Sequence, residues 1–191
     1  MNENRCALNP EQRKFLLDLA RDSIRFGIQN GKPIRVELNE LPAELTVKRA
    51  TFVTLENKGS LRGCIGCLEP IRPLAADVAE NAYAAAFRDP RFPPVMPPEV
   101  DGLDIHLSLL TPADPMTFLS EADLVAQLRP GVDGLILEEG SRRGTFLPSV
   151  WESLPDQHDF LRHLKRKAGL PADYWSSTLK ISRYRTEMVH R

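Results

Sequence analysis

The sequence predicts an α+β fold with a largely antiparallel β-sheet and several α-helices, in one compact unit that can divide into two lobes. Two observations predict this class: strand segments occur as hairpin-like pairs, and helical segments intermix with them without a regular βαβ rhythm. The length of 191 residues and the hydrophobic content of 42% suit one globular domain. We therefore expect a single domain over residues 1–191, with a core at about residues 10–189.

The first helix is predicted by its ends and by its apolar period. Asn9-Pro10 supplies a capping residue and a proline suited to the first helical position, and Asn30-Gly31 supplies the stop. Apolar residues recur every four positions between these ends, at Leu16, Ala20, Ile24 and Ile28. Residues 32–50 show no sustained period and contain two prolines, so we expect loop or edge material there.

A β-hairpin is predicted next, from residues 51–55 and 61–65 around the turn residues 56–60. Gly63 and Gly66 weaken its second strand. Glycine inside a strand marks a bulge or the close approach of another backbone or a ligand, so a bulged hairpin without a ligand stays an alternative.

Four further elements and a loop follow the hairpin. A helix after Pro73 has an apolar period and ends at the proline-rich loop of residues 89–94, and residues 104–110 alternate as a half-buried strand. A short helix over residues 120–128 precedes a second hairpin, from residues 131–138 and 144–147.

The last third of the chain predicts one helix and one strand. The helix covers residues 159–168, is closed by Gly169, and has a wet basic face at Arg162, Lys165 and Arg166. The strand lies between Leu179 and Val189.

The charge balance argues against several classes of partner. There are 25 lysines and arginines against 26 acidic residues, a net charge of −1, so we expect neither nucleic-acid nor membrane binding. The polar start and the absence of 18 consecutive apolar residues predict no signal peptide and no membrane span. Three cysteines, Cys6, Cys64 and Cys67, are too few for a disulfide framework and suit a reducing, cytoplasmic location.

Cys64 is the strongest candidate for chemistry. It lies between glycines, and Arg62 would share its face of a regular strand, where a guanidinium favours the thiolate. His106, on the outward face of a strand expected to be adjacent, is the most plausible base, and Glu69 follows five residues after the cysteine. The alternative is that Cys64 is a small buried hydrophobic residue and His106 an exposed strand residue.

The sequence supports redox chemistry and metal binding less well than nucleophilic chemistry at Cys64. Cys64 and Cys67 have dithiol spacing but lack the strand-helix context of a thioredoxin-like unit. A zinc site would need His158 and His163, which lie roughly 140° apart on a helix. We therefore predict no metal and no cofactor.

Two arginine-containing segments are candidates for holding an anion. Arg143, beside Arg142 and followed by Gly144-Thr145, flanks a flexible backbone suited to a carboxylate or phosphate. A solvated hairpin turn is the alternative there. Asp89 and Arg91 are likewise either a binding pair or a helix terminator with an internal ion pair.

Several segments together resemble the AMMECR-one family, whose prokaryotic members are called AmmeMemoRadiSam system protein A. The likeness covers nearly the whole chain, and its most specific motif is Leu61-Arg62-Gly63-Cys64-Ile65-Gly66. The other segments are Asp89 to Pro94, Gly131 to Leu137, and Arg143 to Pro148. The resemblance implies an α+β protein of two unequal lobes with the signature at a cleft, and a family whose function is not securely established.

The resemblance also implies partners and site residues. The family name records an association with a Memo-like protein, similar to ring-cleaving dioxygenases, and with a radical SAM protein. The residues that carry over are Arg62, Gly63, Cys64, Gly66, Asp89, Arg91, Arg143, Gly144 and Thr145. Cys67 and His106 depart from the family pattern.

Two hypotheses follow, and the sequence does not decide between an enzyme and a non-enzyme. In the first, an enzyme component uses Cys64 with Arg62, and a wider set of residues binds an anionic small molecule or a partner. That set is Gly63, Ile65, Gly66, Glu69, Asp89, Arg91, His106, Arg143, Gly144 and Thr145. In the second, the same strand is a non-catalytic docking surface for a Memo-like or radical SAM partner.

Overall fold

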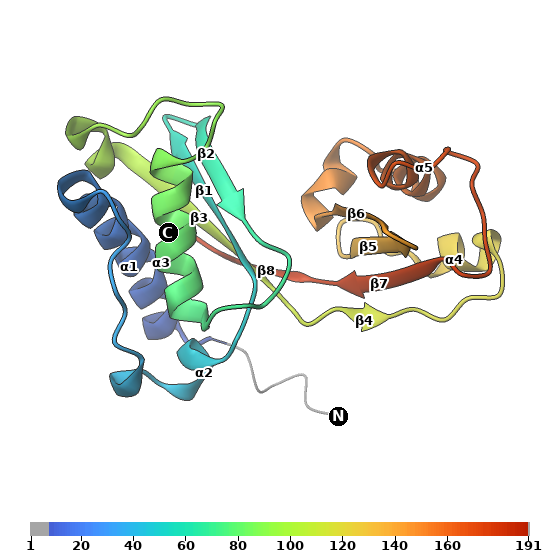
Figure 1. The fold of residues 1–191 in the computed structure, drawn as a ribbon, viewed down its shortest axis with the longest axis horizontal. Helices are drawn as coiled ribbons and strands as arrows, with labels where there is room; N and C mark the ends of the chain where they lie inside the picture. Colours follow the sequence, from blue (N-terminus) through green and yellow to red (C-terminus); the bar gives the residue numbers. More distant parts are fainter. Residues whose placement is uncertain (1–7, 191) are drawn as a thin grey trace. The chain divides into compact units, whose positions relative to one another are not determined.

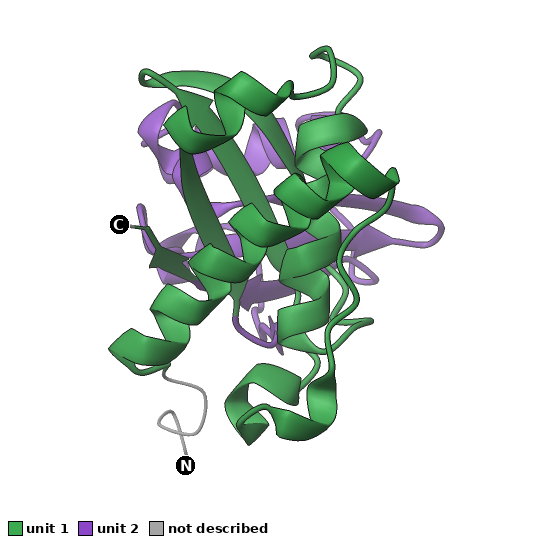
Figure 2. Cartoon of the chain, turned by 90° about the vertical axis from the view of Figure 1, so that its left-hand side faces the viewer, with its two compact units in different colours: residues 1–110, 187–191 green, residues 111–186 purple. Residues whose placement is uncertain are grey.

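The computed structural model describes residues 8–190, and they form two compact units. Of the described residues, the first unit comprises 8–110 and 187–190, and the second comprises Thr111–Thr186 (Figure 2). Each unit has its own four-stranded sheet, its own helices and its own hydrophobic core. The strand pairs with an assigned register are antiparallel, which confirms the predicted α+β class.

The sheet of the first unit has the strand order β2-β1-β3-β8 (Figure 1). The elements that build this unit are α1 (Pro10–Asn30), η1 (Leu38–Glu40), α2 (Ala43–Thr46), β1 (Thr51–Asn57), β2 (Ser60–Gly66), α3 (Leu74–Phe87), η2 (Pro97–Gly102), β3 (Leu103–Leu110) and β8 (Thr186–Val189). Strand β2 is therefore an edge strand, and β1 separates it from β3.

The local sequence signals explain where these elements begin and end. The Asn9 side chain accepts a hydrogen bond from the backbone N–H of Gln12 at 2.8 Å, and the Gln12 side chain accepts one from Asn9 at 3.0 Å. At the other end of α1, Gly31 adopts φ 66°, which favours glycine. In the β1–β2 hairpin, Lys58 and Gly59 both have positive φ, 52° and 77°, as a tight two-residue turn requires.

The two faces of the first sheet differ in composition. Val53, Leu55 and Leu107 are fully buried in one core cluster with residues of α1 and α3. Alternate residues on the same strands point to the opposite face and are half-buried. We call this second face the polar face; it contains Phe52, Thr54, Glu56, Cys64, His106 and Ser108.

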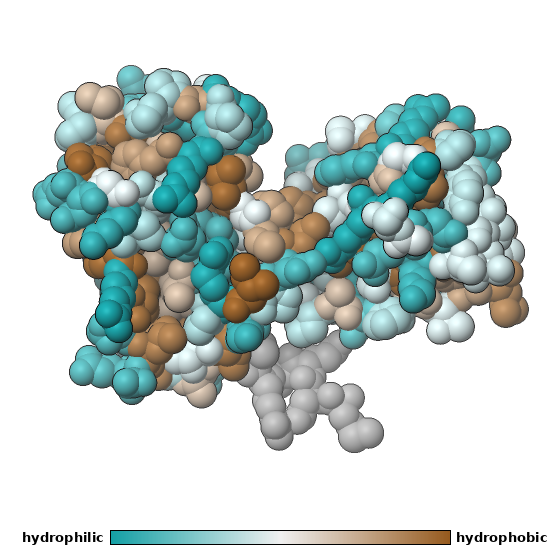
Figure 3. Space-filling model, viewed as in Figure 1, coloured by the Kyte–Doolittle hydropathy of each residue, from teal (hydrophilic) through white to brown (hydrophobic). Residues whose placement is uncertain are grey.

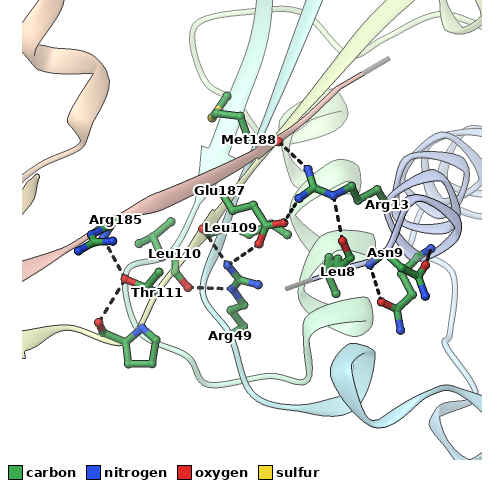
Figure 4. A network of polar contacts seen from close by, with 12 residues as sticks. Leu8, Asn9, Arg13, Arg49, Leu109, Leu110, Thr111, Arg185, Glu187 and Met188 are labelled. Carbon is green, nitrogen blue, oxygen red and sulfur yellow. Dashed lines mark hydrogen bonds and ion pairs between the residues drawn. The ribbon is translucent and has the colours of Figure 1, made fainter. Parts of the chain in front are cut away.

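Strand β8 is fixed to the first unit by the side chain of Glu187 (Figure 4). The buried Arg49 donates to Glu187 Oε2 at 3.1 Å and to the backbone oxygen of Leu110 at 3.0 Å. Arg13 of α1 donates to the other oxygen of the same carboxylate. One carboxylate thus joins β8 to α1 and to the end of β3.

The second unit is built around a sheet of order β4-β7-β5-β6. Its elements are β4 (Asp114–Pro115), α4 (Glu121–Gln127), β5 (Gly134–Glu139), β6 (Arg142–Phe146), η3 (Pro148–Glu152), α5 (Gln157–Lys167) and β7 (Lys180–Tyr184). In its core the rings of Trp151 and Phe160 stack with centroids 3.7 Å apart, and the Trp151 indole N–H donates to the backbone oxygen of Asp133.

Two sequence expectations are corrected in the last third of the chain. The single strand expected between residues 179 and 189 is two strands, β7 and β8, which belong to different sheets. Lys165 is fully buried rather than on a wet basic face, because its Nζ donates to Glu121 Oε1 at 2.9 Å. Arg162 and Arg166 are exposed, as expected.

The surface is mixed in character. Hydrophilic side chains are interspersed with hydrophobic ones on the face shown in Figure 3. Among the large apolar residues, Leu119 is the most exposed, at 95%. Within residues 8–190, none of the helices is both long enough and apolar enough to cross a membrane.

Candidate functional site

The two glycines of the signature strand β2 serve packing. A Cβ on Gly63 would overlap the backbone carbonyl of Ala85, so only glycine lets α3 approach β2 this closely. A Cβ on Gly66 would overlap the ring of Phe52 and the backbone oxygen of Thr51. The close approach that these glycines indicated is therefore made by the protein's own backbone and side chains.

Arg62 lies at an irregularity of the hairpin and pairs with an acid outside the signature. The register shifts between Leu55 and Glu56, so that Glu56 pairs with Leu61 and Leu55 with Gly63. The Arg62 Nε donates to Glu99 Oε1 at 2.9 Å and its Nη2 donates to Glu99 Oε2 at 3.2 Å. The pKa of Glu99 is lowered, first by this hydrogen bond from Arg62. The Arg62 guanidinium is thus bound by a carboxylate.

The side chains of Asp89 and Arg91 hydrogen-bond the backbone N–H and carbonyl oxygen of Cys64 on the edge strand β2. The Cys64 N–H donates to Asp89 Oδ2 at 2.9 Å, and Arg91 Nη2 donates to the Cys64 carbonyl oxygen at 3.2 Å. Arg91 also donates to both carboxylate oxygens of Asp89, which is only 4% exposed. The Arg91 hydrogen bond holds the pKa of Asp89 far below its usual range. Arg91 is therefore the guanidinium that contacts Cys64, through its carbonyl oxygen.

A row of three polar side chains crosses the polar face. Thr54 of β1 pairs with Cys64 of β2 on one side and with His106 of β3 on the other. Thr54 Oγ1 and Cys64 Sγ lie 3.3 Å apart, at hydrogen-bond distance for sulfur. His106 is on the outward face, as predicted, but it lies two strands from Cys64 with Thr54 between them.

The His106 end of this row faces other polar groups and a pocket. His106 Nε2 lies 3.6 Å from Glu56 Oε2, and the His106 and His190 rings have centroids 5.8 Å apart. A pocket of about 280 Å³ is lined by His106, Glu56 and Asp104 of the sheet together with Ile105 and, from α1, Leu17 and Arg21. The imidazole is therefore at the wall of a cavity.

Cys67 is not part of the row. It lies just beyond β2, where its N–H donates to the backbone oxygen of Thr51 at 3.1 Å. Three residues of extended chain span about 10 Å, whereas a disulfide needs Cα atoms within about 7 Å. Cys64 and Cys67 are free, and a bond between them would require the backbone to rearrange. Cys6 lies outside the described residues.

Ile65, Glu69 and the two histidines of α5 are further residues that the sequence analysis considered. Ile65 packs against the core of the first unit, and Glu69 is exposed with its N–H donating to Cys67 Sγ at 3.4 Å. Within the described part of the chain, no group of three or more histidine, cysteine or acidic side chains is placed to hold a metal ion. His158 and His163 are thus not part of such a cluster.

Arg143, Gly144 and Thr145 belong to β6 of the second unit. A Cβ on Gly144 would lie 2.9 Å from the Cβ of Ala168, so this glycine accommodates the end of α5. Thr145 Oγ1 donates to the backbone oxygen of Leu135 at 2.8 Å. Arg143 pairs with Glu138 at 3.6 Å, and its neighbour Arg142 donates to the backbone oxygen of Gly169.

Sequence reasoning missed Thr54, Glu56 and Glu99. The hairpin pattern gave only a partial signal for Thr54, since a regular turn at Lys58-Gly59 would pair it with Gly63, and the register shift between Leu55 and Glu56 pairs it with Cys64 instead. Glu99 gave no comparable signal, because its pairing with Arg62 depends on where η2 packs.

The AMMECR1 family model matches residues 17–189. The chain belongs to the AMMECR1 family. It is 40% identical over 189 residues to a protein of Methanothermobacter thermautotrophicus, with 96% of each chain covered. It is 41% identical over 177 residues to a protein of Thermotoga maritima, with 91% of this chain and 94% of the relative covered.

A solved crystal structure has a similar fold. The crystal structure of an uncharacterized protein from Pyrococcus horikoshii matches with a TM-score of 0.83 and 36% identity, covering 95% of this chain and 92% of that one. Because that protein is itself described as uncharacterized, the function has to be argued from the site.

Proposed function

We propose that this AMMECR1 protein is a component of an enzyme that uses Cys64 as its nucleophile, on a small molecule or on a partner protein. The observation that carries the proposal is the position of the thiol. Its sulfur lies on the polar face beside the Thr54 hydroxyl, 3.3 Å away, while its peptide group is fixed by Asp89 and Arg91. A half-exposed thiol on a rigid backbone has the accessibility and the fixed position that a nucleophile needs.

The proposed chemistry is displacement at an electrophilic carbon. The thiolate sulfur of Cys64 forms the new S–C bond, and the bond from that carbon to its leaving group breaks. The leaving group departs with the electron pair and takes up a proton. The arginines do not carry this proposal, because Arg62, Arg91 and Arg143 are each engaged by a carboxylate.

Alkylation of the native protein tests the proposal without a known substrate. The rate of reaction with iodoacetamide is measured for each cysteine by mass spectrometry, with Cys67 as the control within the same chain. We expect Cys64 to react rapidly at neutral pH and faster than Cys67 while the protein is folded. If Cys64 reacts only after unfolding, the thiol is a packing residue and the proposal is wrong.

A second candidate function is docking of a Memo-like or radical SAM partner without catalysis. It is favoured by two apolar side chains next to the Arg62–Glu99 ion pair: Leu61 is 44% exposed and Met96 is 60% exposed. Exposed apolar residues around an arginine are typical of interaction surfaces. Under this proposal Arg62→Glu abolishes binding of the purified partner, whereas Cys64→Ser leaves it unchanged. Loss of binding in Cys64→Ser with full binding in Arg62→Glu contradicts it.

A further inference from the structure

Cys64, Thr54 and His106 form a row across three neighbouring strands on the polar face. Cys64 and His106 are two strands apart, a separation of roughly 10 Å between their backbones. Thr54 occupies the position between them, with Cβ atoms of neighbouring residues in such a row about 4.5–5.5 Å apart. A hydroxyl both donates and accepts, so Thr54 is the group in this row that can accept on one side and donate on the other.

We infer that Thr54 and His106 form a proton relay that generates the Cys64 thiolate; this inference rests on the proposed function. The Cys64 Sγ gives its proton to Thr54 Oγ1 while the hydroxyl proton of Thr54 passes to a ring nitrogen of His106, directly or across one water. The sulfur keeps its electron pair. The products are a thiolate and an imidazolium, and Thr54 is unchanged.

Glu56 lies beside the ring of His106. His106 Nε2 lies 3.6 Å from Glu56 Oε2. Once the imidazolium has formed, the Glu56 carboxylate attracts its positive charge at short range.

Other ionisable groups surround the relay as well. Glu56 comes from β1, Asp104 from β3 and Arg21 from α1, and all three line the pocket at His106. The ring of His190 lies beyond the end of β8. Two carboxylates and one guanidinium thus line the pocket beside the ring.

The test compares the pH profile of Cys64 alkylation in the full chain among matched variants. Thr54→Val removes the hydroxyl and keeps the shape, Thr54→Ser restores the hydroxyl, and His106→Gln removes the base. Ser108→Ala is the control, since it removes a hydroxyl from the same face outside the row. Cys67 in each variant reports whether general thiol reactivity has changed, and near-ultraviolet circular dichroism reports whether the fold is kept.

We expect Thr54→Val and His106→Gln each to lower the alkylation rate of Cys64 about tenfold at pH 7, equivalent to a shift of the profile by about one pH unit. Thr54→Ser and Ser108→Ala should keep profiles close to that of the unmodified chain. If Thr54→Val fails to fold, the half-exposed His106 still decides the question through His106→Gln.

Two results overturn the relay, and they differ from the failure of the proposed function. If Cys64 reacts fast and its profile is the same in Thr54→Val and His106→Gln, the relay is wrong and the nucleophile stands. If only Thr54→Val has an effect, Thr54 merely contacts the thiol and the relay is again wrong. If Cys64 is inert in the unmodified folded chain, the nucleophile and the relay both fail.

Discussion

The two units each contain an edge strand with a glycine that a helix covers, and the comparison of these strands separates packing from chemistry. In β2 the glycine is Gly63, which faces the backbone of Ala85 in α3. In β6 it is Gly144, which faces Ala168 at the end of α5. Both segments belong to the motifs that suggested the family, and in both the glycine lets a helix pack closely on a strand.

The difference lies in the residues around each glycine. Next to Gly63, Cys64 has its backbone fixed by Asp89 and Arg91 and its sulfur beside Thr54. Next to Gly144, Thr145 donates to a backbone oxygen of its own sheet and contacts the buried Tyr184, whose pKa burial raises to about 12. A glycine-containing motif is thus a weak guide to function, whereas a cysteine with polar neighbours distinguishes the first unit.

Gly63→Ala should have the largest effect on stability. The added Cβ overlaps the backbone of α3, which cannot move away as a flexible side chain can. We therefore expect the free energy of unfolding to fall by about 3 kcal/mol. Urea denaturation of the full chain measures it. Gly102→Ala is the matched control, since a Cβ there meets nothing within 4 Å. Equal stability of the two variants would show that β2 does not need glycine for packing.

Asp89→Asn should have the second largest effect on stability. We expect the free energy of unfolding to fall by about 2 kcal/mol near neutral pH, because the substitution removes the buried negative charge that pairs with Arg91. The pKa of Asp89 is lower in the folded protein than the unfolded value of about 3.9. The stabilisation is therefore complete above about pH 5 and is lost as the pH falls through the folded pKa.

Denaturation curves at a series of pH values check this prediction. The stability difference between the unmodified chain and Asp89→Asn should shrink below about pH 4. A difference that stays constant down to pH 2 would mean that the Asp89 charge does not stabilise the fold.

Gly144→Ala should cost less, about 1 kcal/mol, because its Cβ meets Ala168 at 2.9 Å and the end of a helix can shift by a few tenths of an ångström. Hydrogen exchange should place the loss of protection within Thr111–Thr186. A loss larger than that of Gly63→Ala would reverse the ranking of the two edge strands.

Cys64→Ser should have the smallest effect, under about 1 kcal/mol, because the position is half-exposed and Thr54 can hydrogen-bond the new hydroxyl. Thermal unfolding monitors the change, with Cys67→Ser as the control. The variant should lose all alkylation at position 64 while keeping the fold. A strong destabilisation would identify the thiol as a core residue and would favour packing over chemistry.

Local features of the chain were predictable because they depend on residues close together in sequence. The ends of α1 follow from the cap at Asn9 and the left-handed Gly31, and the first hairpin follows from two strand-like runs around Lys58-Gly59. The close approach of other parts of the chain to the signature strand was also visible, through Gly63 and Gly66. The division of the last strand was not visible, because the segment from Lys180 to Val189 has strand propensity throughout and pairing alone assigns its halves to different sheets.

The sequence by itself therefore determined the fold class and most of the helices and strands, and it singled out Cys64 as the candidate for nucleophilic chemistry. Only the tertiary structure decided the partners of that residue. It paired Arg62 with Glu99, placed Arg91 on the Cys64 carbonyl, and put Thr54 between Cys64 and His106. The physical reason is that caps, turns and periodicity act over a few residues, whereas strand order and side-chain pairing depend on how distant segments bury their apolar faces together.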